Sequence, residues 1–239
     1  MSLTSRFANP AQFIRLADKL LPFLALATLL AFAFGLYYAL FDSPADYQQG
    51  ETVRIMYVHV PAAWVSMGLY LTMAIAAGVG LVARHALADV FCLAAAPVGC
   101  VLVALCLVTG SLWGKPTWGA WWVWDARLTS VLILFLLYCG YITLRHSFED
   151  DERGSKAGAI LLLVGAVNIP IVKFSVDWWH TLHQPASILR MGGSAIAPEM
   201  LRPLLIMAAA YGFYAGFLIL LRMKTVLLTR KISRLSEAP

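Results

Sequence analysis

The sequence predicts an all-α membrane protein, a polytopic bundle of six transmembrane helices that forms one domain over residues 1–239. Apolar residues make up 61% of the chain and charged residues 13%, and the mean hydropathy is +0.76, which is far from a soluble composition. A helix needs about 20 apolar residues to cross roughly 30 Å of hydrocarbon, and six such runs occur here. We therefore expect no separate soluble domain.

Taken in order, the apolar runs predict spans at residues 20–41, 62–83, 90–108, 129–144, 157–172 and 204–221. The first run is too long for a signal peptide and lacks a small-residue cleavage site before Asp42, so we expect it to remain as a helix. The fifth contains Asn168 and Pro170. Because proline leaves a helix carbonyl without its partner, we expect that helix to bend or end early.

The distribution of basic residues predicts the orientation, since cytoplasmic connections carry the excess of Lys and Arg. With the N-terminus inside, 12 of the 18 basic residues fall on the inner side, and the remaining six on the outer side are Arg54, Lys115, Arg127, Lys173, Arg190 and Arg202. Both termini should then be cytoplasmic. The net charge of +5 fits a basic fringe beside anionic lipid, without any nucleic acid.

Several motifs point away from other functions. The acidic run at residues 149–152 is interpreted as a solvated turn, with a docking point for a cytoplasmic partner as the alternative. Without C-x-x-C spacing, the cysteines are expected to be small core residues rather than redox or metal groups: Cys92, Cys100, Cys106 and Cys139. G-S-L-W-G-K at 110–115 is one residue too short for a phosphate loop, so any ATP-driven step belongs to another subunit.

The predicted outer loop between helices three and four, at about residues 110–128, is rich in tryptophan. Five of the eight tryptophans fall here: Trp113, Trp118, Trp121, Trp122 and Trp124. An aromatic belt at the membrane interface is the plainer interpretation. If the chain is helical from Trp118 onward, three of the rings share an arc of about 100° with Asp125 and Trp124 points away. Such a surface suits a large flat ligand such as haem or quinone, with Lys115, Arg127 or Arg54 for its acidic groups.

The histidines favour haem over quinone. His85 and His146 lie at cytoplasmic edges, where we expect them to be solvated. Pro61 is expected in the first turn of helix two, which places His59 at its outer end, and His183 lies beyond the break in helix five. Two outer imidazoles suit bis-histidine ligation of iron, although a lone histidine is more often a cap or a hydrogen-bonding group. If residues 179–183 form a helical turn, the geometry favours His183 over His180.

Four motifs resemble the CcmC family, the haem-handling membrane proteins of bacterial cytochrome c maturation. They are A-D-Y-Q-Q-G at 45–50, Y-V-H-V-P-A-A at 57–63, W-G-K-P-T-W-G-A-W-W-V-W-D-A-R-L-T-S at 113–130 and D-W-W-H-T-L-H-Q at 177–184. The resemblance covers nearly the whole chain. Related haem-handling proteins share the tryptophan signature. The length for six helices, with one histidine before each flanking helix, narrows the resemblance to the CcmC family.

The resemblance implies that haem b is held non-covalently and transiently at the periplasmic face of the bacterial inner membrane. It implies axial ligation by His59 and His183, whereas the motif does not demand a histidine at His180. It also implies delivery to a periplasmic haem chaperone, beside an ABC-type ATPase subunit, a second membrane subunit and a small single-span protein. The expected role is binding and transfer, not enzymatic turnover, because two axial imidazoles leave no open iron position.

Two alternative functions are weighed against haem transfer, and two roles are considered for Asp125. A quinone-linked b-type cytochrome should have ligand histidines deep in its spans, and none lies there. A permease subunit that exports haem should carry polar residues along a lumen, yet the spans hold little beyond Asn168, Ser66 and Thr72. Asp125 either orients the loop, by pairing with Arg127 or capping backbone donors, or forms an interfacial salt bridge without haem contact.

Overall fold

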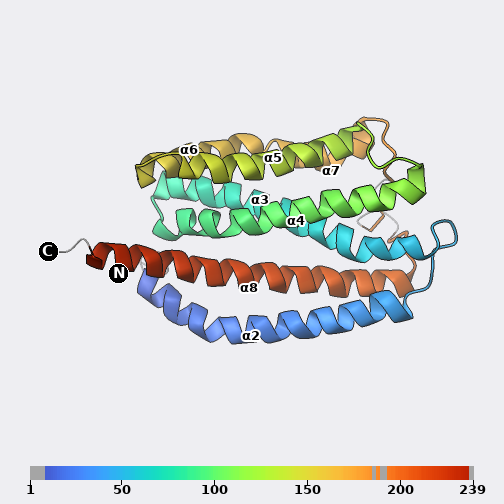
Figure 1. The fold of residues 1–239 in the computed structure, drawn as a ribbon, viewed down its shortest axis with the longest axis horizontal. Coiled ribbons are helices and arrows are strands. Elements are labelled where there is room, and N and C mark those ends of the chain that lie inside the picture. The colour runs from blue at the N-terminus through green and yellow to red at the C-terminus, as the bar shows by residue number, and fades with distance from the viewer. Residues whose placement is uncertain (1–8, 185–186, 189–192, 237–239) are drawn as a thin grey trace.

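The computed structural model describes residues 9–184, 187–188 and 193–236, in which long helices run side by side in one elongated bundle (Figure 1). The elements are α2 (Pro10–Tyr37), the π-helical turn η1 (Tyr38–Asp42), the 3₁₀ turn η2 (Glu51–Ile55), α3 (Met56–Ala83), α4 (Ala86–Trp118), α5 (Ala126–His146), α6 (Asp151–Gly165), α7 (Asn168–Trp178) and α8 (Pro198–Ser236). This part of the chain contains no β-sheet, which confirms the all-α prediction.

Six helical segments are long and apolar enough to cross a membrane, which confirms the predicted number of spans. They are Pro10–Asp42, Glu51–Ala83, Ala86–Trp118, Ala126–His146, Asp151–Trp178 and Pro198–Ser236. Each contains one of the ranges predicted from hydropathy and extends beyond it. The difference arises because hydropathy detects only the apolar part of a helix, whereas hydrogen bonding continues through polar and aromatic residues at its ends.

The helices form three layers, with α2 and α8 on one side, α3 and α4 in the middle, and α5, α6 and α7 on the other side (Figure 1). The most apolar stretch of α4 has 56% of its residues buried, against 6% in the first span. α4 is therefore the central helix of the bundle. Residues from several other helices can reach its ends.

The fifth span is interrupted where the sequence predicts a break. α6 ends at Gly165, a turn follows at residues 166–167, and α7 begins at Asn168. The buried Asn168 side chain donates from Nδ2 to the carbonyl of Ser130 on α5 at 2.9 Å. Pro170 lies in the first turn of α7, where its missing N–H is tolerated. The break thus places a satisfied polar contact between α5 and α7.

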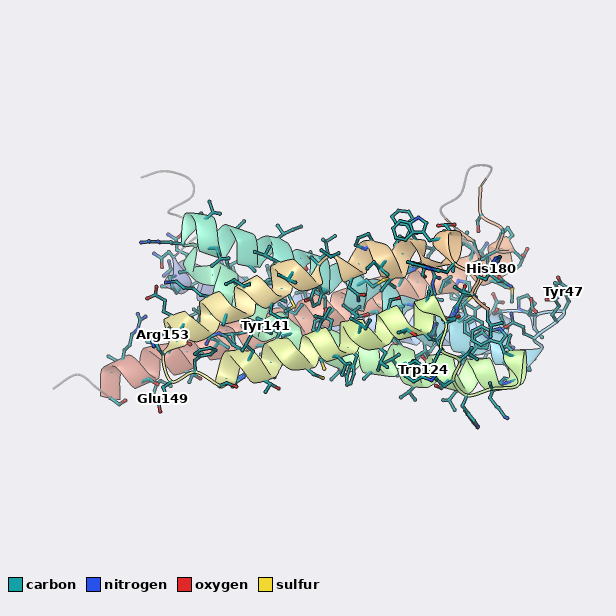
Figure 2. The ribbon with its side chains drawn as sticks, turned by 90° about the horizontal axis from the view of Figure 1, so that it is seen from above. Tyr47, Trp124, Tyr141, Glu149, Arg153 and His180 are labelled. Carbon is teal, nitrogen blue, oxygen red and sulfur yellow. The ribbon has the colours of Figure 1, made fainter. Side chains whose placement is uncertain are left out.

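The two described chain ends lie at the same end of the bundle (Figure 1), and the tryptophan-rich segment lies at the opposite end. Figure 2 shows Tyr47, Trp124 and His180 together at that opposite end, while Glu149 and Arg153 lie near the chain ends. Two of the basic residues counted for the orientation, Arg6 on the inner side and Arg190 on the outer side, fall outside the described residues. Which end faces the cytoplasm stays a prediction. Below, the end that holds Trp124 is called the outer end, and the end that holds Glu149 and Arg153 is called the inner end.

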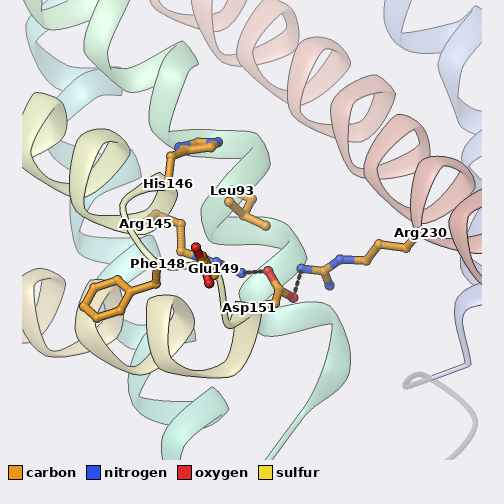
Figure 3. Close-up of a pocket in the computed structure, with 7 residues that line it drawn as sticks. All are labelled: Leu93, Arg145, His146, Phe148, Glu149, Asp151 and Arg230. Carbon is orange, nitrogen blue, oxygen red and sulfur yellow. Dashed lines mark hydrogen bonds and ion pairs between the residues drawn. The ribbon is translucent and has the colours of Figure 1, made fainter.

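At the inner end, four charged side chains join four helices. Arg145 of α5 approaches Asp89 of α4 at 3.4 Å and Asp151 of α6 at 2.5 Å. Arg230 of α8 completes the network, at 2.7 Å from Asp89 and 3.1 Å from Asp151. Figure 3 shows Arg145, Asp151 and Arg230 around a hollow of about 270 Å³. The network stabilises the packing of α4, α5, α6 and α8.

The acidic run at 149–152 differs in part from the solvated turn that its charge predicts. Asp150 is the N-cap of α6, and its side chain accepts from the backbone N–H groups of Glu152 and Arg153. Asp151 belongs to the ion network, while Glu149 and Glu152 are exposed. The run is therefore a helix start as well as a solvated surface, because carboxylates at a helix N-terminus satisfy unpaired donors.

Candidate functional site

The outer end of α4 is longer than the sequence predicts. The helix continues to Trp118 and ends at Gly119, whose φ of 79° is the left-handed conformation that glycine favours at a helix C-terminus. Trp113 and Trp118 therefore belong to α4, and only residues 119–125 form a loop. The predicted loop at 110–128 began too early because the span was ended with its apolar run at residue 108, whereas the helix continues to Trp118 and is terminated by Gly119.

The predicted helical plate from Trp118 onward is wrong, because residues 120–125 are not helical. Trp121 and Trp124 are 56% and 75% exposed, whereas Trp122 is partly buried. The Trp122 and Trp124 rings meet edge to face, with centroids 5.4 Å apart. The tryptophans thus divide into two on the helix, one packed in the loop and two on the rim.

His59 lies in the first turn of α3, at the outer end of the helix as predicted. α3 begins at Met56 directly after η2, so Pro61 is not in the first turn as predicted. His59 Nδ1 is 3.0 Å from the carbonyl oxygen of Cys106 and 3.2 Å from Oγ1 of Thr109. If Nδ1 carries the proton and donates to that carbonyl, Nε2 is left with its lone pair free.

The His59 ring fits a space that a glycine provides. A Cβ atom at Gly110 would lie 3.0 Å from Cε1 of His59, which is tighter than ordinary contact. The ring meets Trp113 edge to face at 5.7 Å between centroids, and Trp113 Nε1 donates to Oε1 of Gln49 at 2.7 Å. Gln49 and Gly110 were not predicted as site residues. The only signal for Gln49 was its place in the A-D-Y-Q-Q-G motif.

His183 lies on a non-helical segment, so the argument that Trp179 and His183 share a helix face is wrong. α7 ends at Trp178, and Trp179 is extended, with φ −133° and ψ 155°. His183 nevertheless packs edge to face on Trp118, with ring centroids 4.9 Å apart, and its Nδ1 is 3.4 Å from Oδ2 of Asp125. His180 is exposed instead (Figure 2).

The surroundings of His183 favour a neutral ring. Burial lowers the pKa of His183 most strongly, the carboxylate of Asp125 raises it in part, and the positive charge of Arg127 lowers it again. The net result is a pKa below its usual value, so the imidazole is uncharged at neutral pH. A neutral imidazole is the form that ligates a metal.

Asp125 caps backbone donors from two directions. It is the N-cap of α5, where Oδ1 accepts from the N–H of Leu128 at 2.7 Å. Its Oδ2 accepts from the N–H of Leu182 at 3.3 Å, next to His183. Among the described residues Asp125 forms no ion pair with Arg127. The capping interpretation is therefore the one that the geometry supports, and the carboxylate joins the tryptophan loop to the His183 segment.

The basic residues proposed for acidic ligand groups are engaged with the protein itself. Arg127 donates from Nε to Oγ of Ser175 at 3.2 Å and from Nη2 to the carbonyls of Val172 and Lys173 at 3.4 and 3.3 Å. It thereby ties the start of α5 to α7.

Arg54 donates from Nη1 to the carbonyl of Ala39 at 2.6 Å and pairs with Glu51. Lys115 donates to the carbonyl of Gly119 at 3.0 Å and lies over the Trp121 ring, 5.9 Å from its centroid. All three cations brace the outer end of the bundle. Contact with an acidic ligand group stays a prediction for each.

The site fits an iron porphyrin on three observations. His59 and His183 contact Trp113 and Trp118, which are five residues apart on α4 and so separated by about 7.5 Å of helix rise. Each imidazole also has Nδ1 beside a protein acceptor, the carbonyl of Cys106 for His59 and the carboxylate of Asp125 for His183. Trp122 Nε1 is buried without a hydrogen-bond partner in the described part of the chain, which leaves one donor for a ligand.

The contacts of the polar span residues disfavour a lumen. Ser66 donates to the carbonyl of Ala63, and Thr72 to that of Leu69, within their own helix. Asn168 is bonded to Ser130 across the α5–α7 contact. The described residues contain no cluster of three or more His, Cys, Asp or Glu side chains that could hold a metal ion. Besides the exposed His180, the described part of the outer end offers two imidazoles that pack against tryptophans, His59 and His183.

Comparison with known proteins gives a consistent result. The family model described as CcmC, heme exporter protein C, matches residues 3–238. Heme exporter protein C of Bradyrhizobium diazoefficiens is 53% identical over 228 residues, which cover 95% of this chain and 86% of that protein.

Heme exporter protein C of Escherichia coli is 44% identical over 223 residues, which cover 93% of this chain and 90% of that protein. A putative cytochrome c biosynthesis ccmC-like mitochondrial protein of Marchantia polymorpha is 43% identical over 205 residues, 86% of this chain and 87% of that protein. With its six spans and a family match over nearly its whole length, the chain belongs to the heme exporter protein C (CcmC) family.

Proposed function

We propose that this protein binds haem b at the periplasmic face of the bacterial inner membrane and delivers it to a periplasmic haem chaperone for cytochrome c biogenesis. The proposal rests on the membership of the family, whose name concerns haem, and on the outer-end geometry. In this orientation both termini are cytoplasmic. The haem is cargo, held non-covalently between the tryptophans and two axial histidines.

The arrangement of the two imidazoles carries the proposal. Each has Nδ1 beside an oxygen acceptor, the carbonyl of Cys106 for His59 and the carboxylate of Asp125 for His183. Such a partner fixes the ring orientation and increases the electron density of the opposite nitrogen, as it does for metal-binding histidines generally. Both side chains are thereby prepared to present Nε2 as the ligand atom.

Transfer rather than turnover follows from this donor set. The iron of a haem has two axial positions. Two neutral imidazoles would fill both, which leaves no site for oxygen or a substrate. His59 lies in α3 and has two partners at Nδ1, whereas His183 lies on a non-helical segment with a single partner at 3.4 Å. His183 is therefore the ligand expected to let go when the haem leaves.

The other subunits of the proposed complex are an ABC-type ATPase, a second membrane subunit and a small single-span protein. Any ATP-driven step would belong to the ATPase subunit, because residues 110–115, the nearest match to a phosphate loop, lie within the helix α4. The ion network around Arg145 and the acidic start of α6 lie at the inner end of the bundle. A cytoplasmic partner would meet this protein there.

Rescue by free imidazole tests the function. His59→Gly and His183→Gly, reconstituted in lipid nanodiscs, are expected to lose the low-spin haem spectrum and to regain it when imidazole is added, while His180→Gly matches the wild type. Haem-loaded wild type should then pass its haem to the purified chaperone. A wild-type protein that takes up no haem, or variants whose spectra match the wild type without imidazole, would contradict the proposal.

A further inference from the structure

A hollow on the edge of the bundle adjoins the proposed haem site and shares Trp124 and Asp125 with it. It occupies about 300 Å³ between α5 and α7. Ser130 and Ile133 of α5 form one wall, and Asn168 and Ile171 of α7 form the other. α7 packs against α5 in the outer layer of the bundle (Figure 1), and Ile133 is exposed. The hollow is thus open on the lateral surface of the bundle.

Beside the start of α7 the hollow is lined by a satisfied polar contact. Asn168 donates to the carbonyl of Ser130, and both side chains are buried. This bond holds α5 and α7 together where α7 begins, and Ile133 lines the hollow about one turn further along α5. Since an α-helix rises by about 1.5 Å per residue, α7 itself runs for roughly 15 Å from this contact to its end at Trp178.

The outer limit of the hollow is aromatic. Trp124 and Trp179 line it, and they are 75% and 51% exposed. Tryptophan is favoured where hydrocarbon meets water, because its ring is apolar and its N–H is polar. The two rings therefore mark the depth at which a molecule in the outer half of the bilayer would meet the protein.

Asp125 connects the hollow to the haem site. It lines the hollow, and its Oδ2 accepts from the N–H of Leu182 and lies 3.4 Å from Nδ1 of His183. A ligand edge in the hollow would lie one side chain away from the proposed axial histidine. The charge of Asp125 disfavours an acidic group beside it, which argues against a phosphate or a carboxylate there and for the apolar edge of a flat ring.

We propose that this hollow is the lateral entry point through which haem passes from the bilayer to His183. The apolar edge of the ring rests between Ile133 and Ile171, and its acidic edge stays at the interface. This inference rests on the proposed function, since it assigns a route to the same haem. It assigns the ligand class, an amphipathic porphyrin delivered from lipid, and the direction of approach.

Filling the hollow from its lipid side tests the route. Ile171→Trp places a large ring in the space, and Ile133→Trp does so from the opposite wall. Ile160→Trp is the matched control, because Ile160 is 57% exposed on α6 and does not line the hollow. Haem is supplied to the apoprotein in two ways: dissolved in lipid vesicles that fuse with the proteoliposomes, or bound to albumin in the medium on the outer side.

Both filling variants should load haem from lipid at least about tenfold more slowly than wild type, because the entry step is obstructed. Loading from albumin, the final low-spin spectrum and the equilibrium affinity should be unchanged, and Ile160→Trp should match wild type throughout.

Wild-type loading rates from lipid in both variants would overturn the proposal and leave the hollow as a place for acyl chains. Equal slowing from both sources would overturn it too, because the haem site itself would then be disturbed. A wild type that forms no low-spin species from either source would instead refute the proposed function.

Discussion

Substituting Gly110 by alanine separates ligand positioning from helix stability. The new Cβ would lie 3.0 Å from Cε1 and 3.5 Å from Nδ1 of His59, where ordinary contacts begin at 3.4 Å. The ring must therefore retreat by about 0.4 Å (3.4 minus 3.0) or rotate. Either motion disturbs the 3.0 Å contact between Nδ1 and the carbonyl of Cys106. At the same time, alanine in a helix interior stabilises by roughly 0.5–1 kcal/mol relative to glycine.

Haem titration of the purified variant, followed by absorption, measures the first effect, and thermal unfolding in detergent measures the second. Loss of a partner that orients a metal-binding histidine costs about 10–100-fold in affinity. At roughly 1.4 kcal/mol per factor of ten, this corresponds to about 1.4–2.8 kcal/mol. We therefore expect haem affinity to fall in Gly110→Ala while its melting temperature stays equal or rises.

Gly68→Ala is the matched control, because Gly68 lies on α3 and a Cβ there has no neighbour within 4 Å. It should gain stability without any loss of haem affinity. Wild-type affinity with an unchanged spectrum in Gly110→Ala would refute the assignment of His59 as a ligand held by this contact. A joint loss of haem and melting temperature would show general disruption of the helix instead.

The remaining predictions concern other contacts of the site and of the inner end. The haem signal should be constant above about pH 6.5, where His183 is neutral, and should be lost as the pH falls through its lowered pKa; spectra across a pH series check this. In Asp125→Asn the acid midpoint should move to lower pH, because the carboxylate raises the pKa of His183, while α5 keeps an N-cap. Gln49→Ala and Trp113→Phe should each cost about 0.5–1.5 kcal/mol of unfolding free energy, and the double variant no more than either, if the bond at 2.7 Å is the shared cause. Arg145→Met should lower the free energy of unfolding by about 1–3 kcal/mol, and with it the melting temperature, because carboxylates of the inner-end network lose a partner; the haem spectrum should be unchanged, since Arg145 lies at the other end.

The fold was largely predictable because a membrane imposes one dominant constraint. Runs of apolar residues that are long enough to cross the bilayer must be helical, so hydropathy identifies all six spans. The break in the fifth span was also predictable, since Asn168 and Pro170 are a polar group and a missing donor within an apolar run. These signals are local, and they act within a few residues of where they stand in the sequence.

The site was less predictable because its geometry depends on helix ends and long-range contacts. Hydropathy ends the third span at residue 108, whereas α4 continues to Trp118, and only the packing of His59 against Gly110 shows that this glycine makes room for a ring. The bond from Trp113 to Gln49 joins residues 64 positions apart. Periodicity cannot indicate such a pair, and it also suggested helical turns after Trp118 and Trp178 that do not form.

One measurement tests the central claim most directly: absorption spectra of the detergent-purified protein, oxidised and reduced, for wild type and for His59→Ala, His183→Ala and His180→Ala. The account predicts sharp low-spin bands in the wild type and in His180→Ala, and their loss in the other two variants. A wild-type protein without haem, or bands that persist in both His59→Ala and His183→Ala, would contradict bis-histidine ligation and leave the tryptophan loop as a surface for a partner protein.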